Sequence, residues 1–358
     1  MNNIARIQEQ LRESGLDALL ILDEKNQRFA AGFPFTDGAV VVGRDRAWLL
    51  TDSRYIEAAE KIAGGCCEVR LFDREHPMTA QVQEVLRSCG EAVGAEEESL
   101  SHGRWAAFEK RLGLRLRPAQ AILRTLRASK TEEEIRSMIR AQRVSEKALA
   151  EVLPLIRPGM TERELMAELV YHMLKNGSEG NSFDPIVVTG KNTSMPHGVP
   201  GDTVIQNGDF VTMDFGSLAD GYCSDLTRTV AVGYATEEMK NVYDIVLRAQ
   251  LAGIAAARSG VPGKVIDEAA RAVIREAGYG PYFGHGFGHS LGLDIHEPPM
   301  AGPTGEALMA ENDLCSAEPG IYLPGKFGVR IEDVMIIRST GAEVITKAPK
   351  DELIIINN

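Results

Sequence analysis

The stretch that decides the fold reads Asp209-Phe-Val-Thr-Met-Asp214-Phe-Gly-Ser-Leu-Ala-Asp-Gly221-Tyr-Cys-Ser-Asp225-Leu-Thr-Arg-Thr-Val230. Both of its arms are rich in β-branched and aromatic residues, and Ala219-Asp220-Gly221 between them has the composition of a turn. The stretch therefore predicts a β-hairpin, and a turn centred between Ala219 and Asp220 places Asp214 opposite Asp225. Opposed residues share a sheet face with Cβ atoms about 5 Å apart. Two carboxylates this close repel each other unless a cation lies between them.

A second stretch repeats the arrangement and reads Ala317-Glu318-Pro-Gly-Ile-Tyr-Leu-Pro324-Gly325-Lys-Phe-Gly-Val-Arg330-Ile-Glu332-Asp333. A turn at Pro324-Gly325 places Glu318 opposite Glu332. The segment between the two hairpins, Gly284-His285-Gly-Phe-Gly-His289-Ser-Leu-Gly-Leu-Asp-Ile-His296-Glu297, holds three of the seven histidines. Four carboxylates and an imidazole suit paired divalent cations such as manganese, cobalt or zinc. Either acidic pair alone is also compatible with a solvated sheet face, and one β-bulge would turn a carboxylate to the other face.

These residues also carry a resemblance to a known family. The order of the acids and the histidine resembles the five metal ligands of the pita-bread metallopeptidases, which include aminopeptidase P, prolidase and methionine aminopeptidase: Asp214, Asp225, His289, Glu318 and Glu332. The strings MDFG, SDLTRT, GHGFGHSLGLDIHE, EPGIY and GVRIED lie between about Asn192 and Asp333 and are similar to those of the aminopeptidase P and prolidase branch. All five positions hold side chains able to bind metal, which argues against a relative such as creatinase that has the fold without the metals.

Composition limits the class of protein. A chain of 358 residues is long enough for two domains. Its net charge of −12 argues against a nucleic-acid partner, because phosphate backbones are bound by clustered lysine and arginine. The N-terminus leads into an amphipathic pattern instead of an apolar signal region, and no segment reaches membrane-spanning length, so no membrane partner is expected. The five cysteines form neither a disulfide framework nor a zinc spacing, which predicts a reducing cytoplasm.

The first part of the chain, residues 1–127, alternates helical and strand patterns. Ile4–Leu11 has helical spacing, Ala18–Leu22 is a short buried strand, and residues 39–43 and 47–51 form a hairpin around Arg44-Asp45-Arg46. This part resembles the N-terminal domain of the prolidase and creatinase relatives, with a loose match at Phe29-Ala-Ala-Gly32-Phe33 to an aromatic-Leu-Thr-Gly-Phe string. It holds no catalytic constellation, and His76 and His102 are expected on the surface.

The second part of the chain, residues 128–358, contains the same order of elements twice. Thr131 with Glu134 and Thr161 with Glu164 are two capping boxes at helix starts. Each half of this region then reads helix, Pro-Gly, helix, hairpin, with Pro-Gly at 158–159 and 262–263. The repetition indicates a weak internal duplication, in which two αβ halves bring one acidic pair each to a shared centre. The expected fold class is α/β (α+β), with an N-terminal creatinase/prolidase-like domain (1–127) and a C-terminal pita-bread domain (128–358) of pseudo-twofold symmetry.

A pair of divalent ions can activate water and polarise a carbonyl for hydrolysis, and the resemblance implies how the ligands divide. Asp214 would chelate one ion, Asp225 and Glu332 would bridge both, and His289 with Glu318 would complete the other. Glu318 would also take a proton from the attacking water and pass it to the leaving amine. The alternative for Glu318 is a ligand without a proton role. The expected cofactor is two divalent ions per chain, with manganese first and cobalt or zinc as alternatives.

Three further histidines and one arginine complete the predicted site. His197 and His296 resemble family histidines that contact substrate or stabilise the tetrahedral intermediate. His285 resembles a substrate-pocket position, although its flanking glycines are equally explained by close packing. Arg330 shares the face of Glu332 by strand alternation. It either orients Asp225 or binds substrate, with a structural salt bridge as the alternative.

The leading hypothesis is a dinuclear metallopeptidase that cleaves between an N-terminal residue and a following proline. The substrate is then a peptide (aminopeptidase) or a dipeptide (dipeptidase) with proline in second position, and the resemblance implies a homodimer. One alternative is a hydrolase of a small non-peptide amide or amidine on the same fold, which a substrate panel would reveal. The other is a non-catalytic binding protein, which metal analysis would reveal by the lack of bound ions.

Overall fold

The computed structural model describes residues 2–357. The chain folds into two compact units, Met1–Arg127 and Ala128–Asn358, each built around its own sheets. No helix within residues 2–357 is both long and apolar enough to cross a bilayer.

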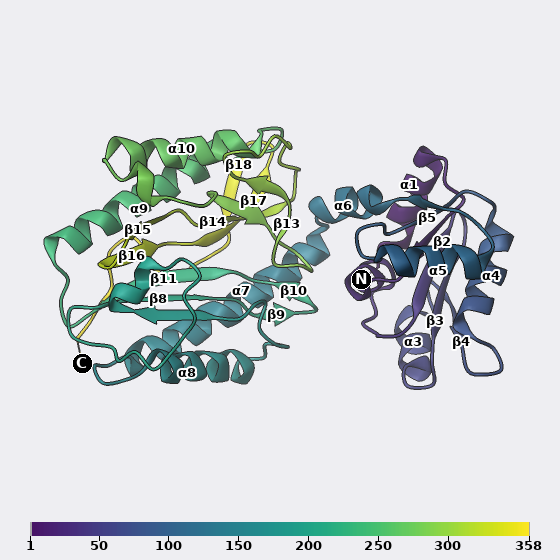
Figure 1. Ribbon diagram of the computed structural model, residues 1–358, viewed down its shortest axis with the longest axis horizontal. Coiled ribbons are helices and arrows are strands. Elements are labelled where there is room, and N and C mark those ends of the chain that lie inside the picture. The colour runs from purple at the N-terminus through teal and green to yellow at the C-terminus, as the bar shows by residue number, and fades with distance from the viewer. Residues whose placement is uncertain (1, 358) are drawn as a thin grey trace. The chain divides into compact units, whose positions relative to one another are not determined.

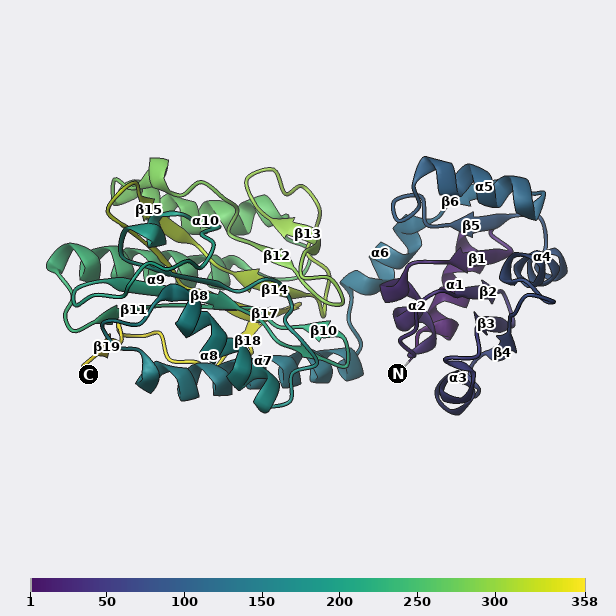
Figure 2. The ribbon, with the colours of Figure 1, turned by 60° about the horizontal axis from the view of Figure 1, so that its bottom comes forward.

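The first unit contains one six-stranded sheet with the strand order β4-β3-β2-β1-β5-β6, which can be followed strand by strand in Figure 2. The strands are β1 Ala18–Ile21, β2 Ala39–Gly43, β3 Ala47–Thr51, β4 Glu68–Leu71, β5 Val93–Ala95 and β6 Leu116–Pro118. The helices are α1 Ile4–Ser14, α2 Glu24–Ala31, α3 Ile56–Ala63, α4 Met78–Cys89, α5 His102–Leu112 and α6 Gln120–Ala128.

The centre of this sheet is buried on both faces, because β1, β2 and β3 are almost continuous apolar runs. On one face Leu20, Val41 and Leu50 form a core with Val85 and Leu86 of α4. The predicted hairpin of β2 and β3 is confirmed by its antiparallel pairing. His76 and His102 are exposed, as predicted.

The second unit contains two larger sheets, ordered β19-β11-β8-β7 and β13-β12-β14-β17-β18, and two short ribbons, β9-β10 and β15-β16. The strands are β7 Ile186–Thr189, β8 Phe210–Phe215, β9 Leu218–Ala219, β10 Tyr222–Cys223, β11 Leu226–Val232, β12 Gly288–Ser290, β13 Glu297–Ala301, β14 Leu314–Ala317, β15 Gly320–Leu323, β16 Phe327–Arg330, β17 Asp333–Arg338, β18 Gly341–Val344 and β19 Ile355–Ile356. The helices are α7 Glu132–Val152, α8 Glu162–Lys175, α9 Glu237–Ala256 and α10 Gly263–Glu276, with short 3₁₀ turns η1 Leu153–Leu155, η2 Gly190–Ser194 and η3 Gly280–Tyr282.

Helices α7 and α8 begin at the two predicted capping boxes. The Thr131 hydroxyl accepts from the Glu134 backbone N–H at 3.3 Å, and the Glu134 carboxylate accepts from the Thr131 N–H at 2.7 Å. Thr161 and Glu164 form the same reciprocal pair. Each box satisfies two backbone donors that a helix start leaves without a partner, and a cap of this kind stabilises a helix by about 1 kcal/mol.

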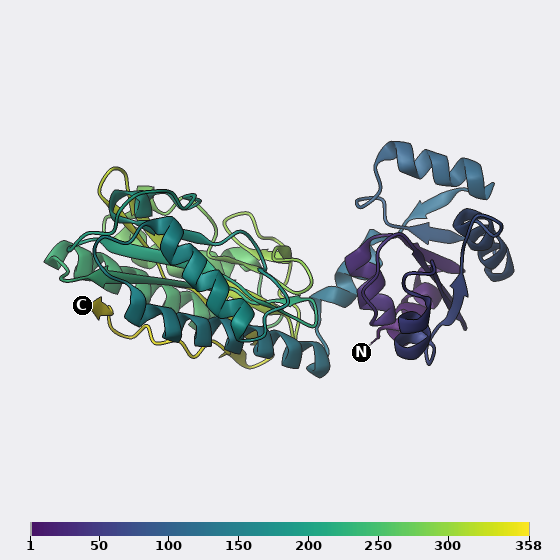
Figure 3. The ribbon, with the colours of Figure 1, turned by 90° about the horizontal axis from the view of Figure 1, so that it is seen from below.

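The strands of the second unit lie between two helix pairs, α7 with α8 on one side and α9 with α10 on the other (Figure 1). Seen from below, α7 and α8 lie across the strands (Figure 3). Each pair has its own core: Leu149 and Leu165 pack with Met213 of β8, while Val246 and Ile266 pack in the core that holds Met335 of β17. The duplicated two-half arrangement predicted for this region is therefore confirmed.

The predicted register of the first hairpin is wrong by two residues. Strands β8 and β11 pair Asp214 with Thr227 and Phe215 with Leu226, so Asp214 and Asp225 are not directly opposed. They are diagonal neighbours instead, because residues two apart on a strand point to the same face. Both carboxylates consequently still belong to one face.

The predicted register of the second hairpin is confirmed. Strands β15 and β16 pair Gly320 with Arg330, and β14 and β17 continue the same register with Ala317 opposite Asp333. Glu318 and Glu332 occupy the gap between these two paired segments and lie opposite each other.

Candidate active site

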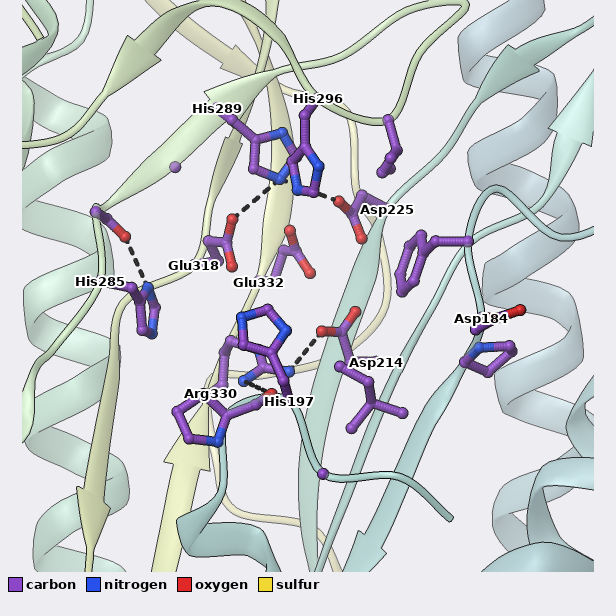
Figure 4. A pocket seen from close by; sticks show the side chains of 18 of the residues that line it. Asp184, His197, Asp214, Asp225, His285, His289, His296, Glu318, Arg330 and Glu332 are labelled. Atoms are coloured by element: carbon purple, nitrogen blue, oxygen red, sulfur yellow. Dashed lines mark hydrogen bonds and ion pairs between the residues drawn. The ribbon is translucent and has the colours of Figure 1, made fainter.

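The acidic pairs of both hairpins and one histidine converge on a common space (Figure 4). Ligand-capable atoms of Asp225, His289 and Glu332 lie within 4.8 Å of one another. Glu318 Oε1 is 3.2 Å from His289 Nε2. Asp214, on β8, projects toward the same group, and its negative charge helps to raise the pKa of Asp225. The five predicted metal-binding residues are therefore close together, although only three of them form the tightest cluster.

Three carboxylate oxygens in this cluster fit a cation. Asp214 Oδ1, Asp225 Oδ1 and Glu332 Oε1 are buried and have no hydrogen-bond partner among residues 2–357. Buried polar atoms almost always have a partner, because burying one without compensation is costly. Burial, together with the neighbouring acids, raises the pKa of Asp225 and of Glu332 well above the ordinary value. A set of buried oxygens and one imidazole with these open positions is the donor set that divalent cations bind.

His289 presents one ring nitrogen to the cluster. Its Nδ1 lies 3.2 Å from the Ser290 carbonyl, to which an Nδ1–H donates, so Nε2 faces Asp225 and Glu318. Such a backbone contact fixes the tautomer that a metal-binding histidine needs. Burial lowers the pKa of His289, but the hydrogen bond and charge of Glu318 outweigh burial and raise it to about 9. In turn, His289 lowers the pKa of Glu318 to about 2 against the effect of burial.

Thr227 joins the two hairpins at the site. Its hydroxyl donates to Glu332 Oε2 at 2.8 Å, and the Glu332 backbone N–H donates to the Thr227 carbonyl at 3.1 Å. These contacts connect β11 to the segment between β16 and β17. The position of Glu332 is therefore fixed by Thr227, a residue of the other duplicated half of the second unit.

Arg330 forms a salt bridge with Asp214, which agrees with the structural alternative considered for it. Its Nη2 lies 2.5 Å from Asp214 Oδ2, its Nη1 donates to the Tyr322 hydroxyl at 2.7 Å, and its Nε donates to Thr227 Oγ1 at 3.2 Å. The residue is 4% exposed. With all three of its nitrogens engaged, and with Nη1 also donating to the Pro196 carbonyl at 3.3 Å, the guanidinium is held in place and positions Asp214.

His285 lies beside this network, with both ring nitrogens engaged. Because the Tyr322 hydroxyl accepts from Arg330, its own hydrogen is directed to His285 Nε2 at 2.9 Å. His285 Nδ1 then donates to the Gly286 carbonyl at 2.8 Å. Burial lowers the pKa of His285, which agrees with a neutral ring. This arrangement matches the packing explanation of His285 better than direct substrate binding.

A cavity of about 530 Å³ opens onto the cluster. His197, His285, His296 and Arg330 all line it, together with the five acidic and histidine side chains described above. The His296 ring stands edge-to-face on the His289 ring, with centroids 4.3 Å apart at an angle of 75°. Burial and the charge of His289 lower the pKa of His296. His197 comes from the loop after η2 and projects toward the cavity from the opposite side (Figure 4). All the predicted site residues thus surround one cavity.

Two side chains at the site were not predicted, although strand alternation would have indicated both. Tyr322, on β15, lies an even number of residues after Glu318 and therefore points to the same face. Thr227, on β11, likewise lies an even number of residues after Asp225 and points to the same face. In the sequence they read as ordinary strand residues, because neither type is a usual metal ligand.

A buried charge network behind the histidines had no detectable sequence signal. Lys130 is 3% exposed, and its Nζ lies 2.7 Å from Asp313 Oδ1 and 3.6 Å from Glu297 Oε2. The other Asp313 oxygen accepts from the Ser290 hydroxyl. Ser290 follows His289 and Glu297 follows His296, so one ammonium group supports the segments that carry both histidines.

Comparison with known proteins gives two family matches that together cover nearly the whole chain. Residues 136–339 match the model of metallopeptidase family M24, and residues 3–129 match the creatinase/prolidase N-terminal domain. The chain is also 35% identical to an Xaa-Pro dipeptidase of Pyrococcus furiosus, over 95% of this chain and 96% of that protein.

Solved structures resemble the chain over its whole length. An Xaa-Pro dipeptidase from Bacillus anthracis superposes with a TM-score of 0.93 at 40% identity, covering 99% of each chain. An X-Pro aminopeptidase from Thermotoga maritima superposes with a TM-score of 0.91 at 34% identity, covering 99% of this chain and 100% of that one. The predicted combination of an N-terminal domain of the creatinase type with a pita-bread domain is confirmed by these matches.

Proposed function

The chain belongs to metallopeptidase family M24, and from this we propose that it hydrolyses the bond between an N-terminal residue and a following proline. Relatives across its full length include proteins named as Xaa-Pro dipeptidases and as Xaa-Pro aminopeptidases. The observation that carries the proposal is the meeting of Asp225, His289 and Glu332 within 4.8 Å at the end of a cavity large enough for a short peptide. The enzyme is accordingly a metalloexopeptidase.

We propose that the site holds two divalent ions, with manganese as the expected metal and cobalt or zinc as alternatives. Asp214 would bind one ion, His289 and Glu318 the other, and Asp225 and Glu332 both. The oxygens left without hydrogen-bond partners belong to Asp214 and to the two proposed bridging residues, Asp225 and Glu332, which supports this division. When bound, the ions lower the pKa of water and polarise the substrate carbonyl.

The remaining side chains act on the proton and on the substrate. Glu318 accepts a proton from the attacking water and passes it to the proline nitrogen as that nitrogen leaves. Its carboxylate is held in position, because Ser316 donates to its Oε1 at 3.0 Å and His289 faces the same oxygen. His197 and His296 reach the cavity from opposite sides (Figure 4). They are placed to donate hydrogen bonds to the carbonyl oxygen as it gains negative charge.

Arg330 and His285 serve the reaction indirectly. Arg330 holds Asp214 in place and balances its charge, and His285 holds the Tyr322 hydroxyl that Arg330 also contacts. The pair therefore fixes the orientation of one metal ligand and the shape of the cavity wall. Proline itself, with no N–H to donate, requires only an apolar surface, and Phe183, Pro185 and Ile186 supply one in the lining.

The test compares peptides that differ only in the second residue. Release of alanine from Ala-Pro-Ala and from Ala-Ala-Ala is measured with manganese, cobalt or zinc, and the bound metal is counted by elemental analysis. About two ions per chain and hydrolysis of the proline peptide alone are expected. Two bound ions with no hydrolysis of any Xaa-Pro peptide would instead favour a small amide or amidine as substrate. A folded protein without affinity for any of these ions would indicate a binding protein.

We also propose that the enzyme is a homodimer in the cytoplasm. The resemblance to the prolidase branch supports the dimer, and light scattering of the purified protein tests it. No disulfide forms among the five cysteines, all of which lie in the described part of the chain. That is the state expected in a reducing compartment.

A further inference from the structure

The cavity contains a single permanent cation, and that cation is already committed. Among the described residues that line it, none is lysine and Arg330 is the one arginine. Arg330 is 4% exposed and donates to Asp214, Tyr322 and Thr227. Redirecting it to a substrate would leave the Asp214 carboxylate buried without its partner, which is costly. Arg330 is therefore held at Asp214 and is not free to move to a negatively charged group of the substrate.

The remaining charges of the lining leave no positive excess. The proposed pair of divalent ions is balanced by the four ligand carboxylates, Asp214, Asp225, Glu318 and Glu332. Asp184 adds a further acidic residue to the lining and offsets Arg330. His285 has both nitrogens engaged, and His197 and His296 are assigned to the reacting carbonyl. A second carboxylate inside the cavity would consequently lack a partner.

Covalent geometry decides where a substrate places its C-terminal carboxylate. In a dipeptide, three bonds separate the scissile carbonyl carbon from the carboxylate carbon, so the two are at most about 4.3 Å apart. The charge of Xaa-Pro must then enter the cavity together with the scissile bond. Each added residue moves the carboxylate outward by about 3.8 Å between Cα atoms, so a tripeptide already places it nearer to solvent.

The mouth of the cavity is apolar and exposed. Val199 is 85% exposed and Met300 is 46% exposed, and both line the cavity. Met300 lies opposite His289 in the pairing of β12 with β13, so the mouth begins directly beside the metal cluster. An uncharged rim of this kind can contact the residues that follow proline, whereas it offers nothing to a carboxylate.

We propose that this site is specific for peptides of three or more residues and acts as an Xaa-Pro aminopeptidase, discriminating against dipeptides by leaving their carboxylate unpaired. The proposal rests on the proposed function and specifies its substrate class. Discrimination of this type is effective because burying a charged group without a partner costs far more binding free energy than losing an apolar contact.

Three substrates of one series isolate the charge. We compare kcat/KM for Ala-Pro, Ala-Pro-NH₂ and Ala-Pro-Ala on the metal-loaded enzyme by release of free alanine, which is common to all three. The amide has the size of the dipeptide without its charge, so it should be hydrolysed about tenfold faster or more, and Ala-Pro-Ala at least as fast as the amide. Equal or faster hydrolysis of Ala-Pro would overturn the inference while leaving the proposed function intact. Failure on all three would overturn the proposed function itself.

A cation introduced at the mouth should weaken the preference for the uncharged substrate. In Met300→Arg, the ratio of kcat/KM for Ala-Pro to that for Ala-Pro-NH₂ should rise at least about fivefold. Met300→Gln, similar in length and uncharged, and Leu174→Arg, on the exposed face of α8, should both keep the wild-type ratio. If Met300→Arg left the ratio unchanged, or if Leu174→Arg raised it as much, the absence of a partner at the mouth would not be the cause of the discrimination.

Discussion

Replacing Lys130 by methionine tests whether the buried charge network behind the histidines stabilises the second unit. The substitution keeps the length of the side chain and removes its ammonium group, which lies 2.7 Å from Asp313 and 3.6 Å from Glu297. Lys130, Asp313 and Glu297 are 3%, 0% and 5% exposed. The variant therefore keeps two carboxylates in the interior without their cation.

Removing one partner of a fully buried ion pair costs about 3–5 kcal/mol, because the charge that remains is not solvated. For a unit of this size, each kcal/mol lowers the midpoint of thermal unfolding by about 2–4 °C. We therefore expect Lys130→Met to lower the midpoint of the second unit by roughly 6–20 °C. Lys240→Met is the matched control: Lys240 also lies 2.7 Å from a carboxylate, that of Glu237, but its side chain is 49% exposed, and exposed pairs contribute little.

The loss should depend on pH. Burial raises the pKa of Asp313 from 3.8 to about 6, while Lys130 acts to lower it, so the variant should have a still higher value. A carboxyl group whose pKa is raised by folding is more favourable in the folded state when it is protonated, and its contribution to stability falls as pH rises through that window. The difference between wild type and Lys130→Met should accordingly be largest at pH 8 and should shrink toward pH 5.

Circular dichroism at a fixed metal concentration follows the unfolding of both units. Both tryptophans, Trp48 and Trp105, lie in the first unit, so their fluorescence serves as an internal reference. The double variant Lys130→Met/Asp313→Asn removes one of the two uncompensated charges and should recover part of the loss. A midpoint within the range of Lys240→Met, or a loss that does not change between pH 8 and pH 5, would refute the reasoning.

Three further predictions concern the metal and its neighbours. Asp214→Asn should lower the metal content and abolish hydrolysis of Ala-Pro-Ala; normal turnover with metal present would remove Asp214 from the ligand set. His296→Ala should retain the metal, as shown by elemental analysis, and lower kcat by about 10²–10³-fold, the range typical of a lost hydrogen-bond donor to the developing oxyanion. Loss of metal in that variant would instead make His296 a ligand. Metal at 100 times its dissociation constant should raise the free energy of unfolding by about 2.7 kcal/mol over that of the protein with a metal chelator present, as measured by denaturant titration. Identical unfolding curves with metal and with chelator would contradict a metal site in the folded state.

The two hairpins show which features of a sequence fix strand register. In the second hairpin the turn at Pro324-Gly325 was placed correctly, and the opposition of Glu318 and Glu332 followed from it. In the first hairpin, Asp220 and Gly221 both have positive φ, at 49° and 73°, so they form a two-residue turn with Ala219 opposite Tyr222. Asp-Gly is a preferred pair for such turns. A turn placed over Ala219-Asp220-Gly221, instead of over the Asp-Gly pair alone, predicts a register that is displaced by two residues.

Residue types and their order were enough to predict the members of the site, but not all of their contacts. Three roles for Arg330 were left open by the sequence, and the structure shows a salt bridge with Asp214 and a hydrogen bond to Thr227, which the register of the first hairpin places beside Asp214. Lys130 and Asp313 are 183 residues apart. Neither lies in a motif, so their pairing follows only from the packing of the chain between them.

The convergence of the two acidic pairs depends on β11 more than on either hairpin turn. Successive residues of a strand point to opposite faces, and on β11 both faces are used. Thr227 on one face donates to the Glu332 carboxylate. Arg228 on the other is fully buried and donates to the Glu332 carbonyl at 2.5 Å, to Asp333 Oδ1 at 2.8 Å and to the Ala348 carbonyl at 2.7 Å. Strand β11, from the first duplicated half of the second unit, therefore holds the backbone and the side chain of Glu332, a proposed bridging ligand from the other duplicated half. The spacing of the candidate metal ligands is consequently set by contacts between the two duplicated halves of the second unit, which the residue pattern within one hairpin does not determine.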